Sequence, residues 1–211
     1  GVRAMRAIAN NPAFENLIDL YLKDNPLGDD GIDALANAPL MHSLQHLHLT
    51  NTGLGGAGIE ALVTQADARA LHTLHLGQNP LTQEDLELLV GWIGMDGVRN
   101  LSLEKLEFSA GHLRALLERC QMTMQSLDLE SCVLDASHMQ VLCEIEMPML
   151  LTLDMTNVAL QDKDLEVLSK SSNIERLSAL TLPKASFSEK ARERFLQNPR
   201  LSAQVRARLF S

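Results

Sequence analysis

The chain repeats one short leucine-rich pattern seven times, and this repetition constrains the fold more than any other sequence feature. The copies are LIDLYLKDNPL, LQHLHLTNTGL, LHTLHLGQNPL, VRNLSLEKLEF, MQSLDLESCVL, LLTLDMTNVAL and LSALTLPKASF. They start at residues 17, 44, 71, 98, 124, 150 and 177, so the period is 26 or 27 residues. Alternation of apolar and polar residues within each copy is typical of a short, half-buried strand. A period of this length indicates stacked, equivalent structural units rather than one irregular core.

The residues between the copies carry the spacing of a helix with one buried side. We call the equivalent positions of successive copies a column. The columns that lie five, eight and nine residues after the last apolar residue of each copy contain almost only apolar or small residues. Spacings of three and four residues place these columns on one helix face. The column one residue further on contains favoured helix N-caps except at Gln161, and its members are Gly28, Gly55, Thr82, Ser109, Asp135, Gln161 and Ser188. Each unit is therefore predicted to be strand, loop, helix and loop.

Stacking these units determines the expected fold class. Neither the apolar strand face nor the apolar helix stripe can be buried within one unit, so neighbouring units must cover one another. Parallel strands stack at about 4.8 Å per unit, whereas helices are roughly 10 Å wide. The stack must therefore curve, and we expect an α/β solenoid with a parallel sheet on the concave face and α-helices on the convex face of a horseshoe segment.

The copies resemble the leucine-rich repeat, LxxLxLxxNxL, and the period is similar to that of the ribonuclease-inhibitor-like subclass. The resemblance covers residues 3–200. The ninth motif position, Asn or Cys in this family, holds Asn25, Thr52, Asn79, Leu106, Cys132, Val158 and Ala185. Because Leu106, Val158 and Ala185 have no polar side chain, we expect the hydrogen-bonded ladder under the loops to be interrupted.

The pattern predicts one repeat domain over residues 1–200, with a half repeat at 1–16 followed by the seven repeats. Met5, Ile8 and Ala9 occupy the helix columns of a repeat whose strand is absent, so we expect the chain to be a fragment of a longer protein. After residue 200 the strand pattern is lost. Leu201 and Val205 have helical spacing, and we expect residues 201–211 to form a C-terminal cap.

Composition excludes several classes of protein. The net charge of −9 argues against a nucleic acid or an anionic membrane as the main partner. Cys120, Cys132 and Cys143 are odd in number and lack the spacing of a disulfide framework, which favours a reducing compartment. The most apolar segment, residues 86–95, is about half as long as a membrane span requires. We therefore expect a soluble, cytoplasmic protein.

The repeat also assigns side chains to the concave face, because motif positions three and five project from the strands and positions two and seven surround them. A histidine cluster lies toward the N-terminal side, and an acidic zone lies beside it. The candidate partner-binding residues are Tyr21, His46, His48, His75, Arg99, Ser102, Glu104, Asp128, Glu130 and Asp154. Tyr21 and Arg99 are candidate anchors, since both residue types are enriched in interface hot spots, and the histidines would add pH sensitivity near neutrality.

These residues also allow one metal-based and one catalytic alternative. His46, His48 and His75 could direct imidazoles toward a zinc ion, but the HxH spacing also follows from two exposed motif positions. His75, Ser102 and Asp128 occupy motif position five of three consecutive repeats. In that order the serine lies between histidine and aspartate, unlike a working triad. We therefore expect no metal, no cofactor and no catalytic residue in this chain.

The expected function is non-catalytic protein binding through the concave face, with a partner that carries a basic surface. The segment GIDALA at residues 31–36 is similar to the helical segments of bacterial effector repeats of the GALA type, and this resemblance implies secretion into a host cytosol. The alternative is an enzyme, either a hydrolase or a ubiquitin-ligase-type transferase. Its catalytic part would lie on the concave face or outside this fragment.

Overall fold

The computed structural model describes residues 1–183 and 186–210 and contains the repeated strand–helix unit throughout. The strands are β1 (Asp19–Tyr21), β2 (His46–His48), β3 (Thr73–His75), β4 (Asn100–Ser102), β5 (Ser126–Asp128), β6 (Thr152–Asp154) and β7 (Ala179–Thr181). The α-helices are α1 (Val2–Ala9), α2 (Gly28–Ala36), α3 (Gly56–Gln65), α4 (Gln83–Val90), α5 (Ala110–Cys120), α6 (Ala136–Glu144), α7 (Asp162–Leu168), α8 (Glu189–Leu196) and α9 (Ala203–Arg208). Short 3₁₀ helices are η1 (Pro12–Phe14), η2 (Pro39–His42), η3 (Ile93–Met95) and η4 (Ser172–Glu175).

The strands form one parallel sheet in which spatial order follows chain order from β1 to β7. The register joins equivalent motif positions, so that Leu20 pairs with Leu47 and Leu47 pairs with Leu74. Each pairing therefore advances by one repeat, as the sequence period predicted. Any concave side chain consequently has the equivalent residue of the adjacent repeat as its neighbour.

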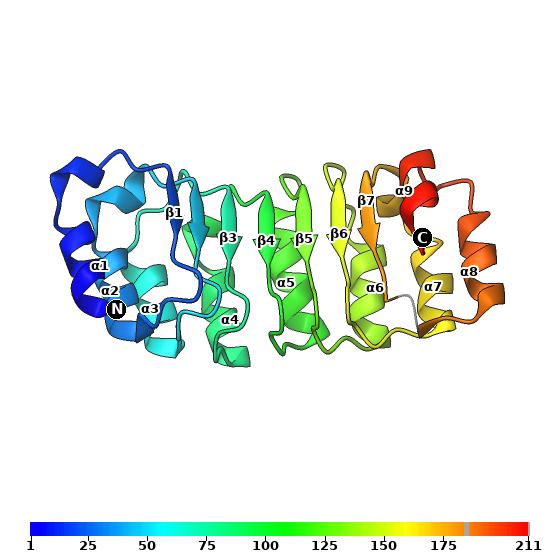
Figure 1. The fold of residues 1–211 in the computed structure, drawn as a ribbon, viewed down its shortest axis with the longest axis horizontal. Helices are drawn as coiled ribbons and strands as arrows, with labels where there is room; N and C mark the ends of the chain where they lie inside the picture. The colour runs from blue at the N-terminus through cyan, green and yellow to red at the C-terminus, as the bar shows by residue number, and fades with distance from the viewer. Residues whose placement is uncertain (184–185, 211) are drawn as a thin grey trace.

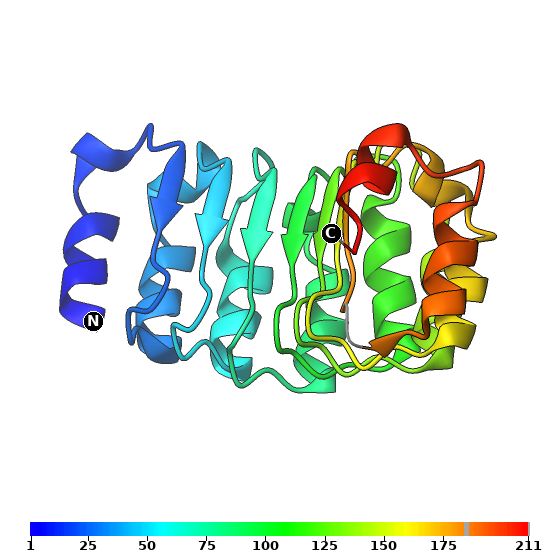
Figure 2. The same ribbon diagram turned by 45° about the vertical axis from the view of Figure 1, so that its right-hand side comes forward.

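The sheet and the helices form two layers, with the strands on one side and α2–α8 on the other (Figures 1 and 2). At the C-terminal end of Figure 1, α8 lies beyond β7, the strand of its own repeat, so the stack curves there with the sheet on its inner side. This confirms the predicted α/β solenoid with an inner parallel sheet. The curvature follows from the greater width of helices compared with the strand spacing.

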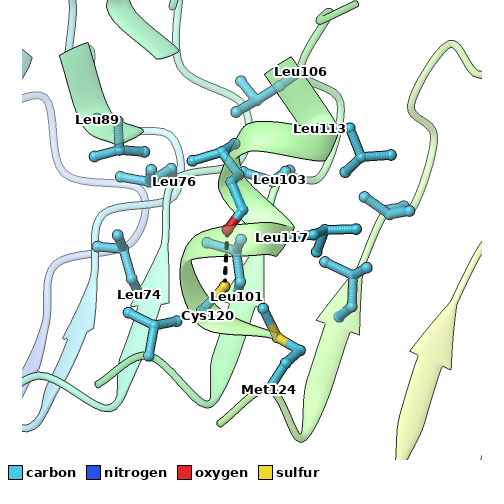
Figure 3. Close-up of a cluster of buried hydrophobic side chains, with 14 of the residues drawn as sticks. Leu74, Leu76, Leu89, Leu101, Leu103, Leu106, Leu113, Leu117, Cys120 and Met124 are labelled. Atoms are coloured by element: carbon cyan, nitrogen blue, oxygen red, sulfur yellow. Dashed lines mark hydrogen bonds between the residues drawn. The ribbon is translucent and has the colours of Figure 1, made fainter. Parts of the chain in front are cut away.

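The core between the layers consists mainly of leucine. Leucines from the strand segments of adjacent repeats lie opposite the inner face of α5, whose Leu113 and Leu117 are fully buried (Figure 3). Cys120 belongs to the same face, and its thiol donates a hydrogen bond to the carbonyl of Leu116 at 3.1 Å. Burying one leucine side chain contributes roughly 2 kcal/mol, and the repeated columns multiply this contribution along the stack.

The ninth motif position forms an interrupted ladder, as expected. The Asn79 side chain accepts hydrogen bonds from the amides of Thr52 and Leu54 and donates to the carbonyls of Leu49 and Leu76. It thereby ties two adjacent repeats together. At the same position Leu106 and Val158 are buried and apolar, so packing replaces hydrogen bonding there, while Ala185 lies outside the described residues.

The residue before the ninth motif position adopts a left-handed backbone in six successive repeats. The residues are Asp24, Asn51, Gln78, Lys105, Ser131 and Asn157, with φ between 54° and 61°. This conformation costs roughly 1 kcal/mol for a non-glycine residue. It also directs the backbone amide to the next repeat, as in the bond from Lys105 N to the Glu130 carbonyl at 2.9 Å. We call these six positions the turn row.

Most helix starts match the predicted N-caps, with two differences. Thr82 and Asp85 form a reciprocal capping box at the start of α4. The prediction for Gly28 is wrong, because α2 begins at Gly28 itself and Leu27 is the N-cap. Gly28 has φ of +62° and its amide donates to the Thr52 carbonyl at 3.0 Å. The second difference is Gln161, which is not a favoured N-cap type but nevertheless lies directly before α7. Its backbone amide donates to the Asp164 carboxylate.

The terminal helices close the two ends of the described stack. Met5 of α1 is 1% exposed, and α1 packs against α2. After β7 the chain forms α8 and then α9, whose Val205 is buried, while the Ser202 hydroxyl donates to the Leu177 carbonyl at 2.8 Å. The limits of the domain at residue 200, of the half repeat and of the cap remain predictions.

We predict that Asn79→Ala lowers the free energy of unfolding by about 3 kcal/mol, because it leaves buried amides and carbonyls of two repeats unpaired. The matched control is Asn25→Ala. Asn25 is exposed and, within the described residues, its side chain donates only to the carbonyls of Leu22 and Lys23 in its own turn, so we expect a loss below about 1 kcal/mol. Urea unfolding followed by circular dichroism measures both. Equal losses would show that the ladder position has no special role.

Candidate functional site

The candidate site is the concave face of the sheet, which faces the viewer in Figure 1. In each three-residue strand the central leucine is buried in the core and the two flanking residues point to the concave side. The side chains at motif positions three and five therefore lie on the concave face, as the repeat pattern predicted. Side-chain size then decides what is accessible: Thr73 and Ser102 occupy concave positions but are only 5% and 2% exposed.

Three aromatic rings form a continuous stack on the first three strands. The rings of Tyr21 and His48 are parallel, with centroids 4.1 Å apart and an interplanar angle of 18°. The rings of His48 and His75 meet edge to face at 4.2 Å, and their Nδ1 atoms are 3.2 Å apart. We call these three side chains the ring column. Tyr21 at its outer end is 66% exposed, so the column presents an apolar, polarisable face to solvent.

Burial favours the neutral form of three histidines in this region, His48, His72 and His75. It is the largest cause that lowers the pKa of His48 to about 4, and the neighbouring His75 and His46 lower it further. Burial also lowers the pKa of His75 and of His72. The prediction of pH sensitivity near neutrality is therefore wrong for His48, because its protonation is displaced well into the acidic range.

The histidines are paired with other side chains rather than arranged around a metal. His46 Nδ1 lies 2.8 Å from the Thr73 hydroxyl, and its Nε2 lies 3.9 Å from Asp19. In the part of the chain that the structure describes, no group of three His, Cys, Asp or Glu side chains is placed to hold a metal ion. The zinc alternative therefore has no geometric support in this structure.

The acidic zone lies on β4–β6 and in the turns that follow them. Asp128 accepts hydrogen bonds from the Ser102 hydroxyl at 2.7 Å and from the Glu130 amide at 2.9 Å. Asp154 uses one oxygen to accept from the Thr156 amide and hydroxyl. Within residues 1–183 and 186–210, no ion pair involves Asp128, Glu130 or Asp154, whereas Glu104 pairs with Lys105 at 3.4 Å.

The structure corrects the assignment of Ser102 as a partner-binding residue. Its side chain is covered by its neighbours, and its hydroxyl is used to hold the carboxylate of Asp128. It is therefore a positioning residue. The bond to Asp128 also leaves His75 without a bond to the serine in the described residues, so the set lacks the order of a nucleophilic triad.

The cysteines also lack the properties of a transfer site. Burial raises the pKa of Cys120 and Cys132 to about 12 and that of Cys143 to about 11. Since the thiolate is the reactive form, these thiols are protonated and unreactive at neutral pH. The ubiquitin-ligase-type alternative consequently has no candidate cysteine among the three.

Sequence analysis missed one hydrogen-bonded chain on the convex side. His112 Nδ1 lies 2.7 Å from the Ser109 hydroxyl, and its Nε2 lies 3.1 Å from Glu87. Ser109 is the N-cap of α5, and its oxygen accepts the amide of His112. His138 occupies the equivalent place after Asp135 in the next repeat. The arrangement is a recurring helix cap, and helix-start spacing could have revealed it.

A groove between α7 and α8 also escaped sequence analysis. It has a volume of about 480 Å³ and is lined by Leu165, Ala191 and Phe195 together with the ion pair of Glu166 and Arg194. The groove depends on how closely two helices pack, which no column of the repeat specifies. It lies on the helix side, away from the predicted concave residues.

One of the comparisons with known proteins matches part of the repeated region. Residues 15–36 and 41–63 match a family model described as Leucine Rich repeat. No curated protein matches the sequence. Among solved structures, the chain is similar to an internalin from Listeria monocytogenes, with 13% sequence identity over 95% of this chain and 86% of that chain, and a TM-score of 0.29.

The two matched segments contain β1 with α2 and β2 with α3, and β3–β7 continue the same register across the described residues. The chain therefore contains leucine-rich repeat sequence in these two segments, within a domain built from repeated strand–helix units of the same register. Domains of this kind are in general non-catalytic modules for protein–protein interaction. In the described part of the chain no helix is long and apolar enough to span a membrane. Membership of the ribonuclease-inhibitor-like subclass remains a prediction from the period.

We predict that His48 titrates near pH 4 when its ring carbon resonances are followed by NMR. Because its folded pKa lies below the unfolded value of about 6.5, protonation favours the unfolded state. The stability contributed by neutral His48 is complete above pH 6.5 and is lost as the pH falls toward 4.

The variant His75→Ala removes a neighbour that lowers the pKa of His48 and exposes its ring, so the midpoint should move upward. The control His112→Ala changes a convex histidine and should leave the midpoint unchanged. A His48 midpoint near 6.5 in the unmodified protein would contradict the burial of the ring column.

Proposed function

We propose that the protein binds a partner protein through its concave face and that the contacted partner surface is basic. The observation that carries this proposal is the acidic zone: Asp128, Glu130 and Asp154 are partly exposed carboxylates that no cation of the described residues neutralises. A matching positive surface would supply the missing charge. Complementary charges of this kind increase the association rate and select the partner.

The ring column and Arg99 provide the anchors in this proposal. Tyr21 is exposed yet held in place by stacking on His48, so little side-chain freedom is lost when a partner covers it. Arg99 is exposed at the motif position before β4, and no ion pair in the described part of the chain uses its guanidinium. Both residue types are enriched in interface hot spots. His48 and His75 contribute as neutral rings, and His46 contributes a further polar contact.

The same proposal places the protein in the cytoplasm, with neither nucleic acid nor membrane as its partner. Its support is the net charge of −9 and the absence of disulfide spacing. A bacterial effector that acts in a host cytosol is the narrower form of this proposal. It rests on the GIDALA segment of α2 and on no contact in the structure.

The test is a quantitative crosslinking capture from native and candidate host lysates. The unmodified domain is compared with Asp128→Lys/Asp154→Lys, which reverses two concave charges. We expect the captured proteins to be depleted at least tenfold with the variant, equivalent to about 1.4 kcal/mol of lost binding free energy. The reason is that the variant faces a basic surface with like charge.

The matched control is Glu60→Lys/Glu84→Lys, which makes the same charge change on exposed positions of α3 and α4. It should capture the partner as the unmodified domain does. Circular dichroism melts establish that both variants are folded. If both variants capture the same proteins in equal amounts, or if the unmodified domain captures none, the proposed concave interface is wrong.

A further inference from the structure

Three large apolar side chains are exposed at the N-terminal ends of the strands that carry the acidic zone. Met122 is 68% exposed, Met149 is 48% exposed and Leu151 is 46% exposed. Single exposed apolar residues are common on protein surfaces, whereas apolar residues that gather in one area are typical of interaction sites. We call these three side chains the Met–Leu rim.

The sheet register brings the members of the rim together. The Leu151 amide donates to the Gln125 carbonyl at 2.8 Å, and Ser126 pairs with Thr152. The turn containing Met122 precedes β5, and the turn containing Met149 precedes β6. These turns therefore belong to adjacent repeats, whose strands are about 4.8 Å apart. The rim consequently forms one edge of the concave surface over β5 and β6.

The carboxylates lie along the same strands at a fixed distance from the rim. Leu151 and Asp154 are three residues apart, which corresponds to about 10 Å along a strand. Between rim and carboxylates lie Ser126 and Thr152, whose hydroxyls bond to each other at 2.6 Å. The surface over β5 and β6 therefore has three parts: the apolar Met–Leu rim at one end, hydroxyl groups in the middle and carboxylates at the other end.

The shape of this surface suits one type of occupant. The sheet curves across its strands (Figures 1 and 2), so a cylinder whose axis is parallel to β5 and β6 fits its inner side. An α-helix is such a cylinder, about 10–12 Å wide, and covers two to three strands. With a rise of 1.5 Å per residue, a distance of about 10 Å corresponds to seven residues, which places residues i and i+7 on one helix face.

We infer that the concave surface over β5 and β6 binds an amphipathic helix of the partner protein. The helix buries an apolar side chain on the Met–Leu rim and places an arginine or lysine seven residues away against Asp128 and Asp154. This inference rests on the proposed function and specifies the partner segment. The recognition mode is that of a helix in a groove, in which apolar and charged residues at helical spacing determine specificity.

The test uses a phage library displayed on a single alanine-rich helix that is randomised at eight consecutive positions. Selection on the unmodified domain should enrich helices with an apolar and a basic residue seven positions apart. The enrichment should be at least tenfold over pairs five positions apart, which lie on opposite faces of a helix. Titration of a selected peptide into protein carrying labelled methionine methyl groups should shift the resonances of Met122 and Met149.

Two variants separate the inference from the function on which it rests. The rim variant Met122→Ser/Met149→Ser/Leu151→Ser should still enrich basic residues but lose the apolar partner at i+7. The carboxylate variant Asp128→Asn/Asp154→Asn should lose the basic enrichment. Leu88→Ser/Ile93→Ser changes exposed apolar residues on α4 and η3 and should select the same helices as the unmodified domain.

Each alternative result has a definite consequence. Basic helices selected without an apolar residue at i+7, or unchanged by the rim variant, overturn the helix inference and leave the proposed function in place. Selection unaffected by the carboxylate variant overturns both. If no helix is enriched, the helix inference fails, and the capture experiment then decides the proposed function independently.

Discussion

The structure depends on mutual burial between neighbouring repeats, because no repeat can bury its own apolar surfaces. Each unit offers a strand with one apolar face and a helix with one apolar stripe, and both are covered only when another unit is added. The leucines of two strand segments against α5 show this directly (Figure 3). Sheet order, curvature and the arrangement of the concave face all follow from that requirement. Hydrogen bonds such as those of Asn79 refine the stack but do not create it.

The fold could be predicted from the sequence because it depends on columns of equivalent residues. Leu47 and Leu74 occupy the same motif position, and the register pairs them as expected. The same register places Tyr21 beside His48. The motif positions give each side chain a direction and a neighbour, which predicted the histidine cluster but not the stacking of its rings on Tyr21.

Properties that depend on the size of neighbouring side chains were not predictable in this way. Ser102 has a concave direction, yet larger neighbours cover it and it holds Asp128 in place. The low pKa of His48 arises first from burial, so pH sensitivity near neutrality was the wrong expectation for this residue. The Met–Leu rim was missed because Met122 and Met149 lie in turns outside the eleven-residue motif. The α7–α8 groove depends on helix packing that no column encodes.

The turn row has a consequence for how this surface can change. Asp24, Asn51, Gln78, Lys105, Ser131 and Asn157 share one backbone conformation although their side chains differ in charge, length and polarity. At Asp24, Asn51, Gln78, Lys105 and Ser131 the backbone amide donates to a carbonyl of the next repeat, so this contact does not use the side chain. The edge of the concave face is therefore a series of interchangeable positions. Its chemistry can be altered one repeat at a time while the curvature of the solenoid stays the same.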